Sequence, residues 1–318
     1  MECRENSSEE SYEFFDNIVN YIEKAKNGES TVGPSNYEDK CSSFMETSGS
    51  HTTDKETAKS ICEEFVKLYY SLKDFKKCFP NGRPDKICSN FLNYWINSKL
   101  RKIMKGEDNC VSHVYDLLES QFSADNDFNI KINDEYIYYI KKNDLKKMNI
   151  LYNLYEKYTV LYNILDNSTN KDKELLLLHS TECCTYYLEA DYMCNDGNNN
   201  NHSQFCTQLK KFETTYKELY DRVDGKGLEY TNNFKRLTQC DNNTVSTALI
   251  GTTVGLAPLL VGLYKFTPLR QLINSNKGKF TQEYRSNDNE MKNIMLMDQG
   301  SEHISSQQGT YNIKYHNV

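Results

Sequence analysis

The sequence predicts an all-α, disulfide-braced ectodomain, followed by one transmembrane helix and a short, mostly disordered tail. Three observations support this fold class. Only 5 Pro and 14 Gly occur in 318 residues, too few for the many tight turns that multi-stranded folds need. All 11 cysteines lie between Cys3 and Cys240. No charged residue occurs from Thr244 to Tyr264, a stretch close to the roughly 20 apolar residues with which a helix crosses a bilayer.

The predicted transmembrane helix, residues 244–264, is the longest uncharged run in a hydrophilic chain. The mean hydropathy of the chain is -0.76 and 26% of its residues are charged. A buried core helix is the alternative, but a soluble helix of this length usually keeps one polar face. Gly251 and Gly255 form a G-x-x-x-G pattern, which lets two helices approach closely, so the sequence also permits a homodimer through the span.

The charges around the span predict its orientation. Basic residues are more frequent just after the span, at Lys265, Arg270, Lys277 and Lys279, than just before it, which places the tail on the cytosolic side. The cysteines agree, because all of them precede the span and disulfides persist in oxidising compartments. The predicted domains are therefore an ectodomain over 1–243, the span over 244–264 and a cytosolic tail over 265–318. The tail is rich in Asn, Ser and Gln and is expected to be mostly disordered.

Apolar residues at helical spacing predict about seven ectodomain helices. A capping box formed by Thr53 and Glu56 is expected to start the second of them. The fifth is expected to break near 141–147, where charges cluster, and no segment shows convincing strand alternation. The predicted helices cover residues 12–26, 54–75, 87–104, 111–118, 134–165, 171–193 and 205–223. A Gly-, Ser- and Thr-rich loop is expected at 27–53, and a polar stalk at 225–243 leads to the membrane.

The cysteines carry the clearest chemistry. Cys78 and Cys88 flank a Pro/Gly turn, and Cys194 and Cys206 flank an Asn-rich loop. Each pair lies where two antiparallel helices meet, which can bring the Cα atoms to the roughly 4.4–6.8 Å of a disulfide. The spacing does not determine the connectivity of the other candidates. These are Cys41, Cys62, Cys110, Cys183, Cys184 and Cys240. The odd number leaves a thiol free or paired with another chain, and Cys3 is the candidate.

The remaining signals argue against catalysis and against nucleic-acid binding. The six His residues show no His-Glu-x-x-His pattern, and neither a P-loop nor a dinucleotide fingerprint is present. No two cysteines stand in C-x-x-C spacing, and Cys183-Cys184 near His179 is a weak zinc signal. The net charge of -7 is unlike the basic surface of a nucleic-acid binder. The sequence predicts no enzyme, no cofactor, no metal and no catalytic residue.

Three stretches together resemble the Plasmodium interspersed repeat proteins, the Vir group among them. The first is CSNFLNYWINSK at 88–99, with Cys88, Leu92, Tyr94 and Trp95. The second is FCTQLKKF at 205–212, and the third is the span with its Lys-Phe-Thr-Pro exit at 250–269. Members of this family usually lack a standard signal peptide, as does this N-terminus. One departure from the family is that this chain continues well past the span.

The resemblance implies a variant surface antigen of a malaria parasite, exported in infected red cells. The expected roles are adhesion to host receptors, immune evasion or both, and the expected partners are membrane lipid, a host cell-surface receptor and antibodies. The expected location is the infected red-cell membrane or a parasite-derived internal membrane, with the ectodomain N-terminal to the span. The alternative is an intracellular membrane scaffold or trafficking protein that works through its C-terminal tail.

Overall fold

The computed structural model describes residues 3–4, 10–30, 33–106, 110–123, 130–166, 173–195 and 203–240. All of them belong to one compact unit, Met1–Thr252, and the second unit, Thr253–Val318, lies outside the described residues. The predicted span, its Gly251 and Gly255, and the tail lie outside them as well. None of the helices in the described ranges is both long and apolar enough to cross a membrane. The span at 244–264 therefore stays a prediction from sequence.

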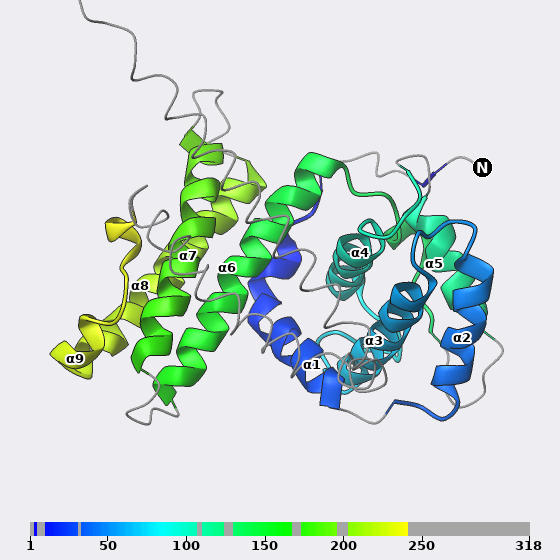
Figure 1. The fold of residues 1–318 in the computed structure, drawn as a ribbon, viewed down its shortest axis with the longest axis horizontal. Coiled ribbons are helices and arrows are strands. Elements are labelled where there is room, and N and C mark those ends of the chain that lie inside the picture. The colour runs from blue at the N-terminus through cyan, green and yellow to red at the C-terminus, as the bar shows by residue number, and fades with distance from the viewer. Residues whose placement is uncertain are drawn as a thin grey trace, which may run out of the picture. The chain divides into compact units, whose positions relative to one another are not determined.

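The described chain is helical, which confirms the predicted fold class for this part of the protein (Figure 1). An isolated β-bridge joins Thr52 to Met104, and none of the residues in these ranges is assigned to a β-strand. The helices are α1 (Ile18–Ser30), α2 (Tyr37–Ser48), α3 (Lys55–Lys73), α4 (Lys86–Leu100), α5 (Val111–Ser120), α6 (Lys142–Asp166), α7 (Lys173–Asn195), α8 (Gln204–Gly225) and α9 (Leu228–Thr231), with 3-10 turns η1 (Glu13–Asn17), η2 (Asp134–Tyr136) and η5 (Leu237–Gln239).

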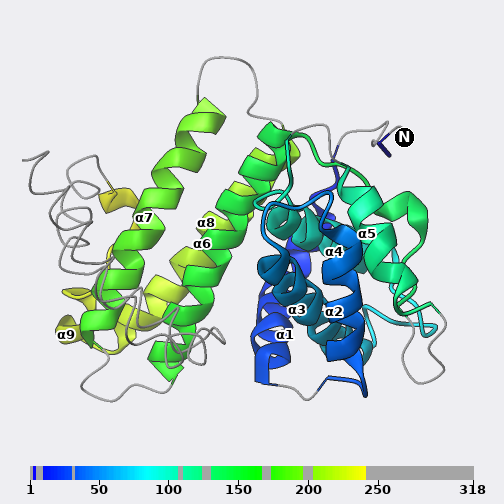
Figure 2. The same cartoon turned by 45° about the vertical axis from the view of Figure 1, so that its right-hand side comes forward.

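Helix α6 lies between two groups of helices, as both views show (Figures 1 and 2). On one side it packs against α7 and α8, and on the other against α1 and α4. The second group is completed by α2, α3 and α5, with α3 in contact with both α1 and α2. One continuous hydrophobic core runs through both groups. The long helices α6, α7 and α8 therefore share a core with the helices at the N-terminal end of the chain.

Helix α2 and the end of α1 together occupy most of the segment 27–53, so the prediction of a loop there is wrong. Cys41 and Phe44 are fully buried on the side of α2 that faces α3. A disulfide between Cys41 and Cys62 joins the two helices. The surrounding Ser, Thr and Glu residues leave too few apolar positions for the helical period to be recognised in the sequence. The helix is stabilised by its tertiary packing and disulfide rather than by a strong amphipathic pattern.

The start of α3 differs by one residue from the predicted capping box. Asp54 is the N-cap, and its carboxylate accepts a hydrogen bond of 3.1 Å from the Thr57 N–H. Thr53 instead donates its N–H and its hydroxyl to the carbonyl oxygen of Ile103, at 2.6 and 3.0 Å. Thr53 thus ties the beginning of α3 to the segment that follows α4, while an Asp cap satisfies the free amides of the first helical turn.

Two asparagines of α4 explain why the helix predicted over 134–165 begins only at Lys142. Asn93 Oδ1 accepts a hydrogen bond from the Tyr138 N–H at 3.1 Å. Asn97 donates to the Tyr138 carbonyl at 3.0 Å and accepts from the Ile140 N–H at 3.2 Å. Both asparagine side chains are buried. They pair with the main chain of 138–140 as a neighbouring strand would, so this segment runs along α4 as non-helical chain with its polar groups satisfied.

Candidate functional site

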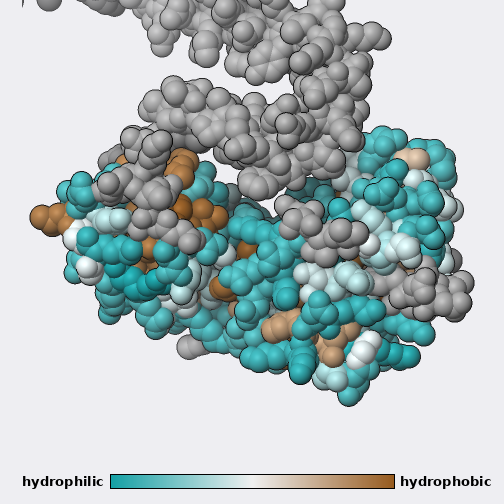
Figure 3. All heavy atoms as spheres, turned by 90° about the horizontal axis from the view of Figure 1, so that it is seen from below, coloured by the Kyte–Doolittle hydropathy of each residue, from teal (hydrophilic) through white to brown (hydrophobic). Residues whose placement is uncertain are grey.

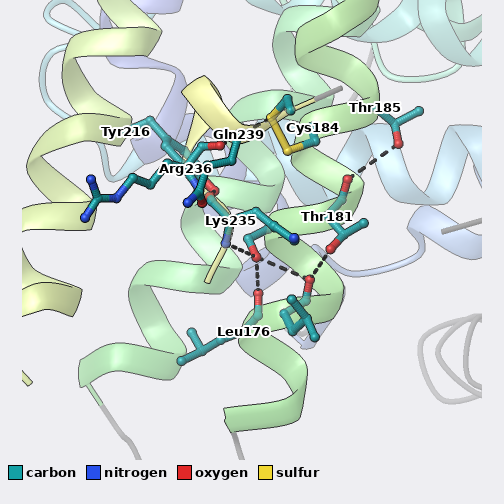
Figure 4. Close-up of a disulfide and its surroundings, with 11 residues drawn as sticks. Leu176, Thr181, Cys184, Thr185, Tyr216, Lys235, Arg236 and Gln239 are labelled. Atoms are coloured by element: carbon teal, nitrogen blue, oxygen red, sulfur yellow. Dashed lines mark hydrogen bonds between the residues drawn. A yellow bond between two sulfur atoms is a disulfide. The ribbon is translucent and has the colours of Figure 1, made fainter. Parts of the chain in front are cut away.

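The last described residues precede the predicted span, and a disulfide and several hydrogen bonds hold them in place. Phe234–Cys240 lie against α7 and α8, and this segment is named the C-terminal clamp below. A disulfide joins Cys240 to Cys184 in the middle of α7, with 5.2 Å between the two Cα atoms (Figure 4). Cys184 is buried and Phe234 is only 3% exposed. The predicted polar stalk is therefore wrong for residues 225–240, since they fold onto the body.

Both main-chain groups of Lys235 bond to the body. Its N–H donates to the Ser180 hydroxyl oxygen at 3.0 Å, and its carbonyl accepts from the Tyr216 hydroxyl at 2.9 Å. The Ser180 hydroxyl in turn donates to the Leu176 carbonyl at 2.6 Å, one turn earlier in α7 (Figure 4). Burial raises the pKa of Tyr216 well above its ordinary value, so the hydroxyl keeps the proton that it donates.

Aromatic contacts complete the clamp. The Phe234 ring lies 5.4 Å from the Tyr216 ring and 5.9 Å from the Tyr220 ring, measured between centroids. The Arg236 guanidinium lies 3.9 Å from the centroid of the Tyr220 ring and hydrogen-bonds to the Tyr220 hydroxyl. Gln239 Oε1 accepts from the Arg236 N–H at 3.1 Å. The clamp is thus fixed by a covalent bond, buried apolar surface and paired polar groups together.

The structure pairs ten of the cysteines. Two disulfides join Cys78 to Cys88 and Cys194 to Cys206, the pairs that flank the turn and the Asn-rich loop. The expectation that Cys3 is the odd cysteine is wrong, because Cys3 is bonded to Cys110, 107 positions along the chain. The Arg4 side chain, 2.5 Å from Asp116, holds the N-terminus beside α5. Such a distant pairing leaves no signal in sequence spacing.

The free thiol belongs to Cys183, which directly precedes the clamp cysteine in α7. Its side chain is fully buried, and burial raises the pKa of the thiol. A buried, protonated thiol is a poor nucleophile. The folded protein is therefore expected to react with no thiol reagent, and the unfolded, unreduced protein to expose a single thiol per chain.

Labelling with a chromogenic thiol reagent, with and without denaturant, measures this difference. A Cys183→Ala variant is the control, and it should abolish the signal in denaturant. Rapid labelling of the folded wild-type protein would contradict the assigned pairing.

An ion pair between α6 and α7 lies next to Cys183 in the chain. Lys157 Nζ lies 2.5 Å from Glu182 Oε2, and His179 Nδ1 lies 3.0 Å from the same oxygen. Burial raises the pKa of Glu182, but hydrogen bonds from His179 and Lys157 outweigh this effect and lower it overall. His179 thus has a carboxylate partner on its own helix, one turn before Cys183. In the described ranges no three His, Cys, Asp or Glu side chains are grouped as metal ligands.

Comparison with known proteins finds a similarity in the C-terminal part of the chain. Residues 227–318 match the family model described as Plasmodium vivax Vir protein. The match starts just before α9 and covers the clamp, the predicted span and the tail. The match includes the tail, so the expectation that the tail departs from the family is wrong. No curated protein and no solved structure matches the chain.

Proposed function

The chain is a Vir-like protein, and on that premise we propose that it is a variant surface antigen of a malaria parasite, exported to the infected red cell. The body of residues 1–240 would lie outside the membrane, the span at 244–264 would cross it, and the tail at 265–318 would face the cytosol. The work of such a protein is interaction, through adhesion to a host receptor, presentation of a variable surface to antibodies, or both.

The observation that carries this proposal is the distribution of disulfides. Five of them brace the body, and the last ends at Cys240, directly before the predicted span. Disulfides persist in oxidising compartments and are rare in the reducing cytosol. The disulfides all lie before the predicted span, and no cysteine lies after it. This distribution favours export of the N-terminal part of the protein.

The surface of the body suits recognition. On the face seen in Figure 3, the coloured surface is mostly hydrophilic, with hydrophobic residues showing in a few places. Rigid helices joined by disulfides present side chains in fixed positions, which lowers the entropy that binding a receptor or an antibody costs. Exposed residues on such a scaffold can vary without loss of the fold, because the disulfides and the core lie beneath them.

The alternative is an intracellular membrane scaffold or trafficking protein that works through the tail. The match to the family continues through the tail to Val318, which favours a role for this segment in family members generally. The two proposals differ in the side of the host membrane on which the body lies, so topology discriminates between them.

Protease treatment of intact infected red cells tests the proposal. Antibodies against α8 and against the tail report on the two sides of the span separately. The surface-antigen proposal predicts loss of the α8 epitope and survival of the tail epitope. Permeabilised cells, in which both epitopes should be lost, control for protease access. Survival of both epitopes in intact cells would place the body inside the host cell and reject adhesion at the surface.

A further inference from the structure

Helix α7 carries exposed apolar side chains. The residues Leu176, Ser180, Cys183 and Ala190 of α7 are buried, whereas Leu177, Leu178 and Tyr192 are 37%, 40% and 67% exposed. The exposed positions recur at helical spacing and extend for about 22 Å along the helix axis. These positions, together with the half-buried Thr181 and Leu188, are named the outward face of α7, which thus consists of Leu177, Leu178, Thr181, Thr185, Leu188 and Tyr192.

The polar atoms on the outward face already have partners within the helix. The Thr181 hydroxyl donates to the Leu177 carbonyl at 2.6 Å. The Thr185 hydroxyl donates to the Thr181 carbonyl at 3.5 Å (Figure 4). Threonines of α8 bond back in the same way, as Thr214 does to the Lys210 carbonyl at 3.1 Å, so these bonds do not distinguish the two helices. They do leave the threonine hydroxyls of the outward face with a partner when water is removed. The face therefore offers methyl groups, leucines and a tyrosine.

Helix α8 shows what an ordinary water-facing surface looks like in the same protein. It has nearly the same length, 22 residues against the 23 of α7. Its exposed positions carry many charges, among them Lys210, Lys217 and Asp221. A surface helix in water usually keeps such a charged face. The six positions of the outward face carry no charge, although Glu182 and Glu189 lie beside them on the helix, and this contrast with α8 favours an apolar neighbour on this side of α7.

The clamp limits where that neighbour lies. Cys184 is buried midway along the length of α7, and the Cα of Cys240 lies 5.2 Å from the Cα of Cys184. Only Asp241, Asn242 and Asn243 separate Cys240 from the predicted span. Four Cα–Cα steps reach at most about 15 Å. If the span crosses a bilayer, as the proposed function requires, the lipid surface begins within that distance of Cys240, beside the middle of α7.

We propose that the outward face of α7 lies on the lipid surface next to the span. The other sides of α7 are occupied by α6, α8 and the clamp, which leaves the outward face to meet the lipid. Its leucines would enter the boundary between head groups and acyl chains, where Tyr192 also suits the amphipathic environment. Figure 3 shows hydrophobic residues at the surface on the α7–α9 side of the body. The body would then rest on the membrane through α7.

Tryptophan fluorescence in vesicles tests the contact with the full-length protein. The natural Trp95 is replaced by Trp95→Phe, so that each reporter is the only tryptophan. The reporters are Leu188→Trp on the outward face, Thr214→Trp on the exposed side of α8, and Leu256→Trp in the predicted span. Phosphatidylcholine vesicles with brominated acyl chains quench tryptophans that reach lipid. Quenching of the Leu188→Trp and Leu256→Trp reporters, but not of Thr214→Trp, is the expected result.

Two control variants separate a lipid contact from other neighbours. Leu178→Glu with Thr185→Glu adds charge to the outward face and should abolish quenching of the Leu188→Trp reporter. Thr207→Glu with Thr214→Glu, at matching exposed positions seven residues apart on α8, should leave it unchanged. A Leu188→Trp reporter whose emission is blue-shifted but not quenched would reveal a second copy of the chain and overturn the proposal.

The span reporter separates this inference from the proposed function on which it rests. If Leu256→Trp is quenched and Leu188→Trp behaves like Thr214→Trp, the protein is membrane-anchored and the contact of α7 with lipid is rejected. If Leu256→Trp is not quenched either, the membrane anchor itself is rejected, and with it the inference.

Discussion

Replacing Cys184 and Cys240 by serine should detach the clamp and lower the free energy of unfolding by about 4 kcal/mol. The disulfide closes a loop with a sequence separation of 56, so its loss restores much conformational entropy to the unfolded chain. For a body of this size the thermal midpoint should fall by about 10 °C. Calorimetry measures this shift. Hydrogen exchange at the Lys235 amide, which now donates to Ser180, should accelerate.

The matched control is the double serine replacement of Cys194 and Cys206. That disulfide closes a loop with a sequence separation of 12, so the expected loss is about 3 kcal/mol. Exchange at the Lys235 amide should remain slow in this control, because the clamp is intact. If both double variants had the same exchange at Lys235 as the wild type, the hydrogen bonds and aromatic contacts alone would hold the clamp, and the disulfide would have no specific role there.

Replacing Asn97 by leucine should destabilise the body by about 4 kcal/mol, because each buried polar group left without a partner costs roughly 1–3 kcal/mol. Asn97 is fully buried. Its side chain bonds to the Tyr138 carbonyl and the Ile140 N–H, and leucine would leave both main-chain groups without these bonds. Urea titration followed by circular dichroism measures the loss of stability. The helical signal of the folded state should change little, since Leu is a good helix former.

Ser98 provides the control for this prediction. It neighbours Asn97 in α4, but its hydroxyl donates to the Trp95 carbonyl of its own helix, at 2.8 Å. Ser98→Ala should therefore change the stability by less than about 1 kcal/mol. Equal effects of the two substitutions would show that Asn97 is not the main support of the segment 138–140.

The sequence predicts the long helices well, because their apolar residues recur clearly at the helical period. The pattern of Phe205, Leu209, Phe212 and Tyr216 predicts α8 nearly to its ends. Helix α2 has only Cys41 and Phe44 as fully buried hydrophobic residues, so its period is hidden among polar residues. The non-helical segment before α6 cannot be recognised in the sequence either, because its main chain is held by bonds to Asn93 and Asn97 on another helix.

The clamp could be predicted only in part. Short loops that bring cysteines together, as between Cys78 and Cys88, are visible in spacing. The bond from Cys240 to Cys184 spans two helices and a turn, and nothing local indicates it. The composition of residues 225–240 gives a wrong prediction, because their Gly, Lys and Asn residues are typical of an exposed stalk. Buried Phe234 and the pairing of Lys235 with Ser180 and Tyr216 hold this polar segment on the body.

The pairing of Cys184 with Cys240 in cells decides whether an oxidised body is clamped to the start of a membrane span. Disulfide mapping tests it most directly: protein from infected cells is alkylated before lysis, digested without reduction and analysed by mass spectrometry. A cross-linked peptide joining Cys184 to Cys240 is the expected result, with Cys183 alkylated only when denaturant is present. Alkylation of both Cys184 and Cys240 in the protein from cells would contradict it, because the body would then be reduced and the clamp open.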